Sequence, residues 1–418
     1  MATNLDPARI RAAFPALDLG VAYFDGPGGS QVPSPVAEAV AGALTAGLSN
    51  RGTVTDAERR ADEVVAGARA AVGDLLGADP RGVVFGRSMT QLTFDFARTL
   101  SRSWGPGDEV VVTRLDHDAN IRPWVLAAER TGATVRWLDF DPETAELDDL
   151  ETVLTTRTRL VAVTAASNLL GTRPDVRAIA DSAHEVDALV YVDGVHLAPH
   201  APVDVAALGA DFLGCSPYKF FGPHLGVLAA SPSLLERLTP DKLLPSTDAV
   251  PERFELGTLP YELLAGLTAA VDFIAGLASG LDKLDHRGPD DGTPAHPAPD
   301  RRARVLESMA AVEEYEAGLF DRLLDGLGAI DGVTLHGRPA RRTPTVLFSV
   351  AGHTGREVYE QLARVGVNAP ASHFYAIEAS RRAGLGDEGA VRAGIAPYTT
   401  AEDVDRLLRA VSQKLTPA

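Results

Sequence analysis

Short apolar runs alternate with amphipathic runs between about residues 82 and 230. The apolar runs predict strands at 82–86, 108–116, 134–140, 158–167 and 188–194, and two further strands at 211–216 and 225–231. The runs between them predict helices that begin near residue 89 and cover 121–132, 146–154 and 176–186. Strands that are apolar throughout and separated by helices are typical of a parallel sheet covered on both faces. The pattern therefore predicts an α/β fold.

The last third of the chain has a different pattern. Residues 280–302 are rich in Pro, Gly, Asp and charge, which predicts an exposed loop. A long helical pattern follows at 304–327, then a strand-like run at 343–350 and amphipathic helices at 355–366 and 401–415. We expect a large domain over 20–270 and a small α+β domain built from 1–19 and 271–418.

Composition and charge limit the partners and binding sites that the protein can be expected to have. The 418 residues carry a formal charge of −18 with no basic block, which argues against nucleic acid and anionic membranes as partners. No run is long and apolar enough for a spanning helix, and the charged start is unlike a signal peptide. The single cysteine forms neither an intrachain disulfide nor a zinc site by itself, and no metal site is predicted. We expect a cytoplasmic protein.

Several polar residues follow directly on the predicted strands. Ligand sites of open α/β sheets lie beyond the carboxyl ends of the strands. The residues to consider are therefore Ser88, His117, Asn168, Asp193 and Ser216.

Lys219 is the first candidate for chemistry. It lies in "GCSPYKFFGPHLG", in a chain with only four lysines among its 39 basic residues. A partly desolvated lysine amine is nucleophilic and forms Schiff bases, whereas an arginine stays protonated. The alternative is an ordinary surface lysine.

Asp193 ends an apolar run 26 positions before Lys219. A buried carboxylate needs a cationic partner, and the protonated ring nitrogen of pyridoxal phosphate (PLP) is one. The alternative for Asp193 is a turn residue.

Other strand-end residues suit the rest of such a cofactor. His117 is a candidate for stacking on its ring, and Asn168 for donating to its phenolate oxygen; a structural histidine and an Asx-turn are the alternatives. "GRSMTQ" offers Ser88 and Thr90 at a strand-to-helix turn, where phosphates bind, and Ser216 offers a further hydroxyl. Arg392 is a candidate for a substrate carboxylate, with a surface arginine as the alternative.

Taken together, these motifs resemble a known family. "YFDGPGGSQVP", "HDAN", "SNLLGT", "YVDGVHLAPH", "SPYKFFGPHLGVL", "FELGT" and "VRAGIAPYTTAEDVDRL" are similar to the class V aminotransferases, and within them to the cysteine desulfurase-like group. The resemblance covers roughly residues 20–270 and 340–412. It implies the PLP-dependent transferase fold type I, with a mostly parallel seven-stranded sheet sandwiched by helices and a small C-terminal domain.

The resemblance also implies roles for individual residues. Lys219 would hold PLP as a Schiff base and later shuttle a proton, Asp193 would pair with the ring nitrogen, and His117 would stack on the ring. Asn168 and His196, the latter in the place of a Gln in many relatives, would lie near the phenolate oxygen. The positions on the phosphate side are Met89, Thr90, Ser216 and Tyr218. Desulfurases usually have a hydroxyl residue and a histidine where this chain has Met89 and Tyr218. Gly257 and Thr258 would reach the phosphate of the neighbouring subunit, which implies a homodimer.

The substrate side departs from the family pattern. Arg392 matches the arginine that binds the substrate carboxylate. True desulfurases carry a nucleophilic cysteine on the loop that corresponds to 366–380, and here Tyr375, or its neighbour Phe374, takes that place. A second arginine usual before that cysteine is missing as well, with Pro370 near its place. The lone Cys215 precedes the lysine loop, so its position does not substitute for the missing nucleophile.

These observations predict a PLP enzyme that acts on a small amino acid. An aminotransferase-like reaction is the first interpretation. C–S or other β-lyase chemistry is the alternative, racemisation would use the same residues, and a non-catalytic protein of the same fold stays open. A nucleotide-binding protein has no support, because neither GxGxxG nor a Walker-type loop opens a helix.

Overall fold

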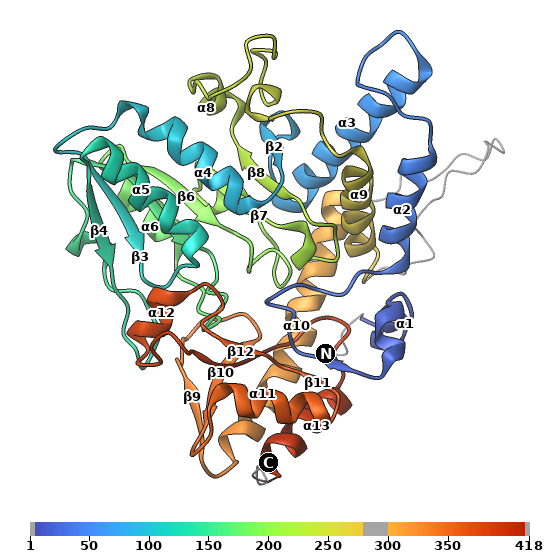
Figure 1. Cartoon of the computed structure of the whole chain (residues 1–418), viewed down its shortest axis with the longest axis vertical. Coiled ribbons are helices and arrows are strands. Elements are labelled where there is room, and N and C mark those ends of the chain that lie inside the picture. The colour runs from blue at the N-terminus through green and yellow to red at the C-terminus, as the bar shows by residue number, and fades with distance from the viewer. Residues whose placement is uncertain (1–4, 279–299, 414–418) are drawn as a thin grey trace.

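A seven-stranded sheet forms the centre of the larger part of the molecule (Figure 1). The structure is a computed structural model that describes residues 5–278 and 300–413. The strand order is β2-β8-β7-β6-β5-β3-β4, and only β8 runs against its neighbours β2 and β7. The predicted mostly parallel sheet is confirmed, with strands β2 (Val83–Gly86), β3 (Glu109–Thr113), β4 (Thr134–Leu138), β5 (Thr158–Thr164), β6 (Leu189–Asp193), β7 (Phe212–Cys215) and β8 (Gly226–Ala230).

Helices cover both faces of this sheet, which explains why its inner strands are mostly apolar. In β6, Val190 and Val192 pack on one face and Tyr191 packs on the other. The first face is covered by α3 (Asp56–Leu76), α6 (Val176–His184), α9 (Tyr261–Ala275) and the first half of α10 (Arg301–Gly328). The second face is covered by α4 (Met89–Leu100) and α5 (Arg122–Thr131).

A four-stranded antiparallel sheet forms the centre of the C-terminal part. Its order is β12-β13-β10-β9, with β9 (Val333–His336), β10 (Thr345–Val350), β12 (Ala371–Ser372) and β13 (Ala390–Gly394). The second half of α10, α11 (Gly355–Arg364) and α13 (Ala401–Ser412) pack against it. The remaining helices are α1 (Pro7–Ala12), α2 (Ser34–Thr45), α7 (Val205–Leu208), α8 (Pro232–Glu236) and α12 (Ile377–Arg382).

The start of the chain joins this C-terminal part. Strand β1 (Ala22–Tyr23) pairs in parallel with β11 (Val367–Asn368), so the segment just after residue 20 packs beside the small sheet. The predicted division at residues 20 and 270 stays a prediction. Most of the expected exposed loop at 280–302 lies outside the described residues, and α10 begins at Arg301, at its end.

The predicted helix over 146–154 is wrong. Only a 3-10 turn at Leu150–Thr152 forms there, and Leu147 is held in a bridge to Phe140. The segment carries four acidic side chains, including two adjacent aspartates. Asp is a weak helix former, and like charges three or four positions apart repel each other on a helix.

No helix in the described ranges combines the length and the apolar character that crossing a membrane requires.

Candidate functional site

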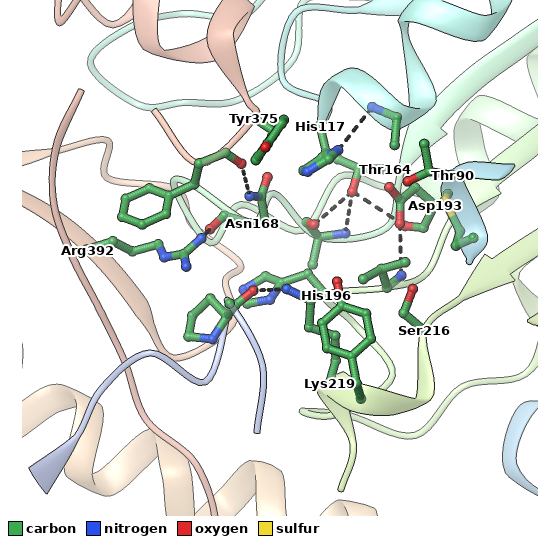
Figure 2. A pocket seen from close by; sticks show the side chains of 18 of the residues that line it. Thr90, His117, Thr164, Asn168, Asp193, His196, Ser216, Lys219, Tyr375 and Arg392 are labelled. Atoms are coloured by element: carbon green, nitrogen blue, oxygen red, sulfur yellow. Dashed lines mark hydrogen bonds between the residues drawn. The ribbon is translucent and has the colours of Figure 1, made fainter. Parts of the chain in front are cut away.

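A cavity of about 380 Å³ lies where the carboxyl ends of the central strands face the small sheet (Figure 2). Segments from both ends of the chain close it, namely 25–28 and 370–375. Most residues predicted from the sequence line this cavity: Met89, Thr90, His117, Asn168, Asp193, His196, Ser216, Tyr218, Lys219, Tyr375 and Arg392.

Lys219 ends a 3-10 turn that follows directly on β7, and its Nζ donates to the carbonyl oxygen of Pro27. Burial disfavours the ammonium form, and the positive charge of Arg392 adds to this effect. Together they lower the pKa of Lys219 to about 7. A large share of the amine is therefore neutral near neutral pH, as a nucleophilic lysine requires.

Asp193 is the last residue of β6 and is buried. Its Oδ1 accepts a hydrogen bond from the amide of Val195 at 2.9 Å. Burial raises the pKa of Asp193 to about 6, against the smaller opposing effects of this hydrogen bond and of Lys219. A cationic group placed beside the carboxylate would stabilise its charged form.

His117 presents a neutral ring to the cavity. Its Nδ1 accepts from the amide of Ala119 at 3.0 Å, which assigns the ring proton to Nε2. Burial, followed by the positive charges of Lys219 and Arg392, lowers its pKa to about 4. The ring lies nearly parallel to that of Tyr375, with 5.6 Å between centroids and 24° between planes.

Arg392 lies on β13 and is almost completely buried at 1% exposure, which excludes the surface-arginine alternative. Its Nη1 donates to the carbonyl oxygen of Asn168, and its Nη2 pairs with Asp25, each at 3.0 Å. The ring of Phe374 covers the guanidinium, with 3.7 Å from the guanidinium carbon to the ring centroid. Burial lowers the pKa of Arg392 to about 10, which leaves it charged at neutral pH.

The opposite end of the cavity suits a phosphate. Figure 2 shows Thr90 and Ser216 on the side away from Arg392. Met89 and Thr90 open helix α4, whose N-terminus presents free backbone N–H groups and the positive end of the helix dipole. Ser88 does not line the cavity, because its hydroxyl caps this helix by accepting from the amide of Gln91 at 3.1 Å.

Gly257 and Thr258 are not brought to this cavity within one chain. Thr258 lines a separate cavity together with Gly86, Gln91 and Asp95. Gly257 has a φ of 83°, in the left-handed region that favours glycine. The expected contact of this pair with the phosphate of a neighbouring subunit stays a prediction.

The loop that carries Tyr375 is held in an unusual backbone conformation. Phe374 and Tyr375 both have positive φ angles, 49° and 59°, which non-glycine residues rarely adopt. Asn168 donates to the carbonyl of Phe374 at 3.0 Å, and the amide of Asp118 donates to that of Tyr375 at 2.7 Å. These bonds hold the two aromatic rings over Arg392 and His117.

The residues present fit PLP. Two buried polar atoms of cavity-lining side chains, Asn168 Oδ1 and His196 Nδ1, have no hydrogen-bond partner among the described residues. A buried carboxylate, a lysine amine of lowered pKa and a helix N-terminus complete a set that matches a phosphorylated pyridine aldehyde. The cavity volume is also within the roughly 300–1,000 Å³ of small-molecule sites.

The sequence interpretation missed two groups that line the cavity and one buried group next to His117. Asp25, the ion-pair partner of Arg392, lies in the "FDGPGG" motif, but its partner is 367 positions away. Thr164 ends β5 and lines the cavity, where its hydroxyl donates to the carbonyl of Ala166 at 2.7 Å. Asp116, next to His117, is fully buried, and burial raises its pKa to about 8.

Cys215 is the last residue of β7 and has no exposed surface. It does not line the cavity, and burial raises the pKa of its thiol. A buried thiol of raised pKa supplies little nucleophilic thiolate.

The family follows from comparison with known proteins. The model of the family described as Aminotransferase class-V matches residues 22–287 and 304–407. This chain belongs to the class V aminotransferases. Its relatives include an uncharacterized protein of Mycobacterium tuberculosis, 36% identical over 412 residues, which are 97% of this chain and 98% of that protein. The aminotransferase-like protein FGM3 of Gibberella zeae is 31% identical over 97% of this chain and 98% of its own.

Solved structures of the family agree with this assignment. The cysteine desulfurase CsdA of Escherichia coli matches with a TM-score of 0.82 and 28% identity over 98% of both chains. The predicted fold type I is thereby confirmed, and so is the predicted resemblance. Class V aminotransferases depend on PLP, and this chain is a PLP-dependent enzyme of that family.

Proposed function

We propose that this class V enzyme acts on a small amino acid in an aminotransferase-like reaction and does not form a persulfide. One observation carries the proposal. A lysine amine with a pKa of about 7, a buried carboxylate and a buried arginine face one cavity at Lys219, Asp193 and Arg392. A protein that had lost its chemistry would have no need to keep all three.

In this proposal, one end of the cavity binds the cofactor and the other binds the substrate. Bound PLP supplies an aldehyde for an amine and a ring that accepts electrons. Thr90, Ser216 and the N-terminus of α4 hold the phosphate, together with Gly257 and Thr258 of a second copy of the chain. Asp193 keeps the ring nitrogen charged, and His117 covers one face of the ring.

The substrate enters at the other end. Arg392 binds its carboxylate, because a guanidinium offers two parallel N–H donors to a carboxylate. Tyr375 and Phe374 face the substrate from the loop above. The Lys219 amine, which is close to half neutral near pH 7, takes up and returns the proton at the substrate Cα.

Two features support the exclusion of persulfide chemistry. The loop at 366–380 contains no cysteine, and a phenol or phenyl group cannot store sulfur. Cys215 is buried in the central sheet with a raised thiol pKa. The similarity to the desulfurase CsdA favours C–S or other β-lyase chemistry as the second candidate.

A single assay separates these candidates. The purified enzyme with PLP is incubated with a panel of amino acids, and keto acid, sulfide and ammonia are measured in parallel. Turnover that strictly requires an acceptor keto acid is the expected result. Ammonia or sulfide without an acceptor would instead establish a lyase, and a yellow protein without any turnover would establish a non-catalytic role.

A further inference from the structure

A second cavity, of about 290 Å³, lies behind the active-site wall. His200 and Glu316 line it together with Arg173, Glu313, Arg342 and Thr343. His196 lines the PLP cavity on the other side. The two histidines therefore lie between the two cavities. The proposed function assigns no role to His200.

His200 and Glu316 form a buried pair. Glu316 comes from α10, and its Oε2 lies 2.8 Å from Nδ1 of His200. Their side chains are only 1% and 4% exposed. A buried carboxylate is costly without a partner, so this contact fixes the orientation of the imidazole.

The ring of His200 packs against that of His196. His196 and His200 are four positions apart on the turns that follow β6, and their ring centroids are 5.1 Å apart at an interplanar angle of 74°. The Nε2 of His196 lies 3.0 Å from the hydroxyl of Thr345. Its Nδ1 has no partner among the described residues and belongs to a side chain that faces the PLP cavity.

The basic groups nearest His196 disfavour a proton on its ring. Lys219 and Arg392 lie on its active-site side, and His200 lies behind it. Glu313, Arg173 and Arg342 border the rear cavity, where Glu313 and Arg173 pair with each other. Burial, followed by the His200, Lys219 and Arg392 charges, lowers the pKa of His196 far below its usual value.

We propose that Glu316 and His200 are positioning residues that hold His196 neutral and in one ring tautomer on the cofactor side of the wall. The inference rests on the proposed function, in which His196 faces PLP. In many relatives the resemblance places a glutamine here, a side chain that is neutral at every pH. A histidine matches that property only while its ring stays neutral; burial favours the neutral ring, and the His200–Glu316 pair packed behind it adds to this effect.

Three variants test this proposal. Glu316→Gln keeps the shape of the side chain and removes its charge. His196→Gln removes the ring on which the pair is proposed to act. Glu313→Gln is the matched control, because Glu313 lies on the same helix and borders the same cavity but pairs with Arg173.

The first readout is the pH midpoint of the visible spectrum of the PLP-loaded enzyme. Glu316→Gln should shift this midpoint by about one pH unit, equivalent to a tenfold change in proton affinity. In the His196→Gln background the same substitution should shift nothing, and Glu313→Gln should shift nothing in either background. A shift of equal size with and without His196 would overturn the proposal.

The second readout needs neither turnover nor cofactor. Nitrogen-15 NMR of the histidine rings reports the charge and tautomer of His196 in the wild-type protein across the pH range. His196 should stay neutral in a single tautomer from mildly acidic to alkaline pH, and protonation near its ordinary pKa would overturn the inference. If Glu316→Gln fails to fold, protonation of His196 in the wild type still overturns the inference, and failure of the wild type to take up PLP would instead count against the proposed function.

Discussion

Two basic and two acidic side chains line the PLP cavity. Lys219 and Arg392 are cationic, while Asp25 and Asp193 are anionic. Arg392 lowers the pKa of Lys219, and the two carboxylates oppose this effect more weakly. The lysine is therefore prepared for reaction by burial and by a neighbouring arginine.

The lowered pKa of Lys219 predicts how PLP uptake depends on pH. The neutral amine is the reactive form, so the rate should rise as pH rises through about 7 and then level off. Arg392→Gln removes a positive neighbour and should move the midpoint upward. The appearance of yellow colour after PLP is mixed with cofactor-free protein measures this rate, and a midpoint near 10 in the wild type would contradict the prediction.

Asp193→Asn should separate cofactor uptake from turnover. Asparagine keeps an oxygen for the amide of Val195 but has no charge for the ring nitrogen. The protein should still turn yellow, while turnover falls by about 10²–10³-fold, as on loss of a preorganised electrostatic contact. Asp139→Asn, in an ion pair with Arg382 away from the cavity, is the control and should leave turnover unchanged. Full activity in Asp193→Asn would refute the assigned role.

The sequence could predict the placement of side chains that directly follow the buried central strands. Residues just after buried parallel strands gather at one edge of the sheet, and this rule placed His117, Asn168 and Asp193 together. The sequence carries no comparable pattern for contacts between segments that are far apart along the chain. The Asp25–Arg392 pair and the His200–Glu316 pair depend on how the two parts of the molecule pack.

At the scale of elements, most of the central strands were predictable because they are buried on both faces, unlike the edge strand β4. Continuous apolar runs result, as in β6, where neighbouring residues pack in different clusters. The acidic segment at 146–154 was not predictable from spacing alone, because its charges and its bridge to Phe140 outweigh its apolar periodicity.

The contact between β8 and the start of α4 predicts a site-specific effect of Gly226. A Cβ on this glycine would lie 2.2 Å from the carbonyl carbon of Ser88, so Gly226→Ala must push the strand away from the turn that carries Thr90. We expect a loss of about 1–3 kcal/mol in the free energy of unfolding, as for other overpacked sites, together with weaker PLP binding.

Urea unfolding and a PLP titration measure both effects. The control is Gly105→Ala, since nothing lies within 4 Å of a Cβ at that position. Equal behaviour of the two variants would show that the close approach at Gly226 does not matter.

At the scale of the whole molecule, the homodimer is a proposal that complementation can test. Thr258 lies away from the Lys219 cavity of its own chain, so a variant of Thr258 should impair only the neighbouring site. Lys219→Ala and Thr258→Asp should each be inactive alone. A mixture of the two variants should regain roughly a quarter of wild-type activity, because random pairing makes half of the dimers mixed and each mixed dimer has one intact site of two.

Light scattering should show twice the 44.0 kDa of one chain. A monomer, or a mixture that stays inactive although dimers exchange, would contradict the shared site. The cytoplasmic location expected from the sequence stays a prediction.

The most direct test of the proposed chemistry is to identify the lysine that binds PLP. The PLP-loaded enzyme is reduced with borohydride, which makes the bond between cofactor and amine permanent, and its peptides are mapped by mass spectrometry. The cofactor should be found on Lys219 alone, and Lys219→Ala should stay colourless and unmodified. Modification of Lys242, Lys283 or Lys414, or of no lysine in a protein that has taken up PLP, would contradict the assignment of Lys219.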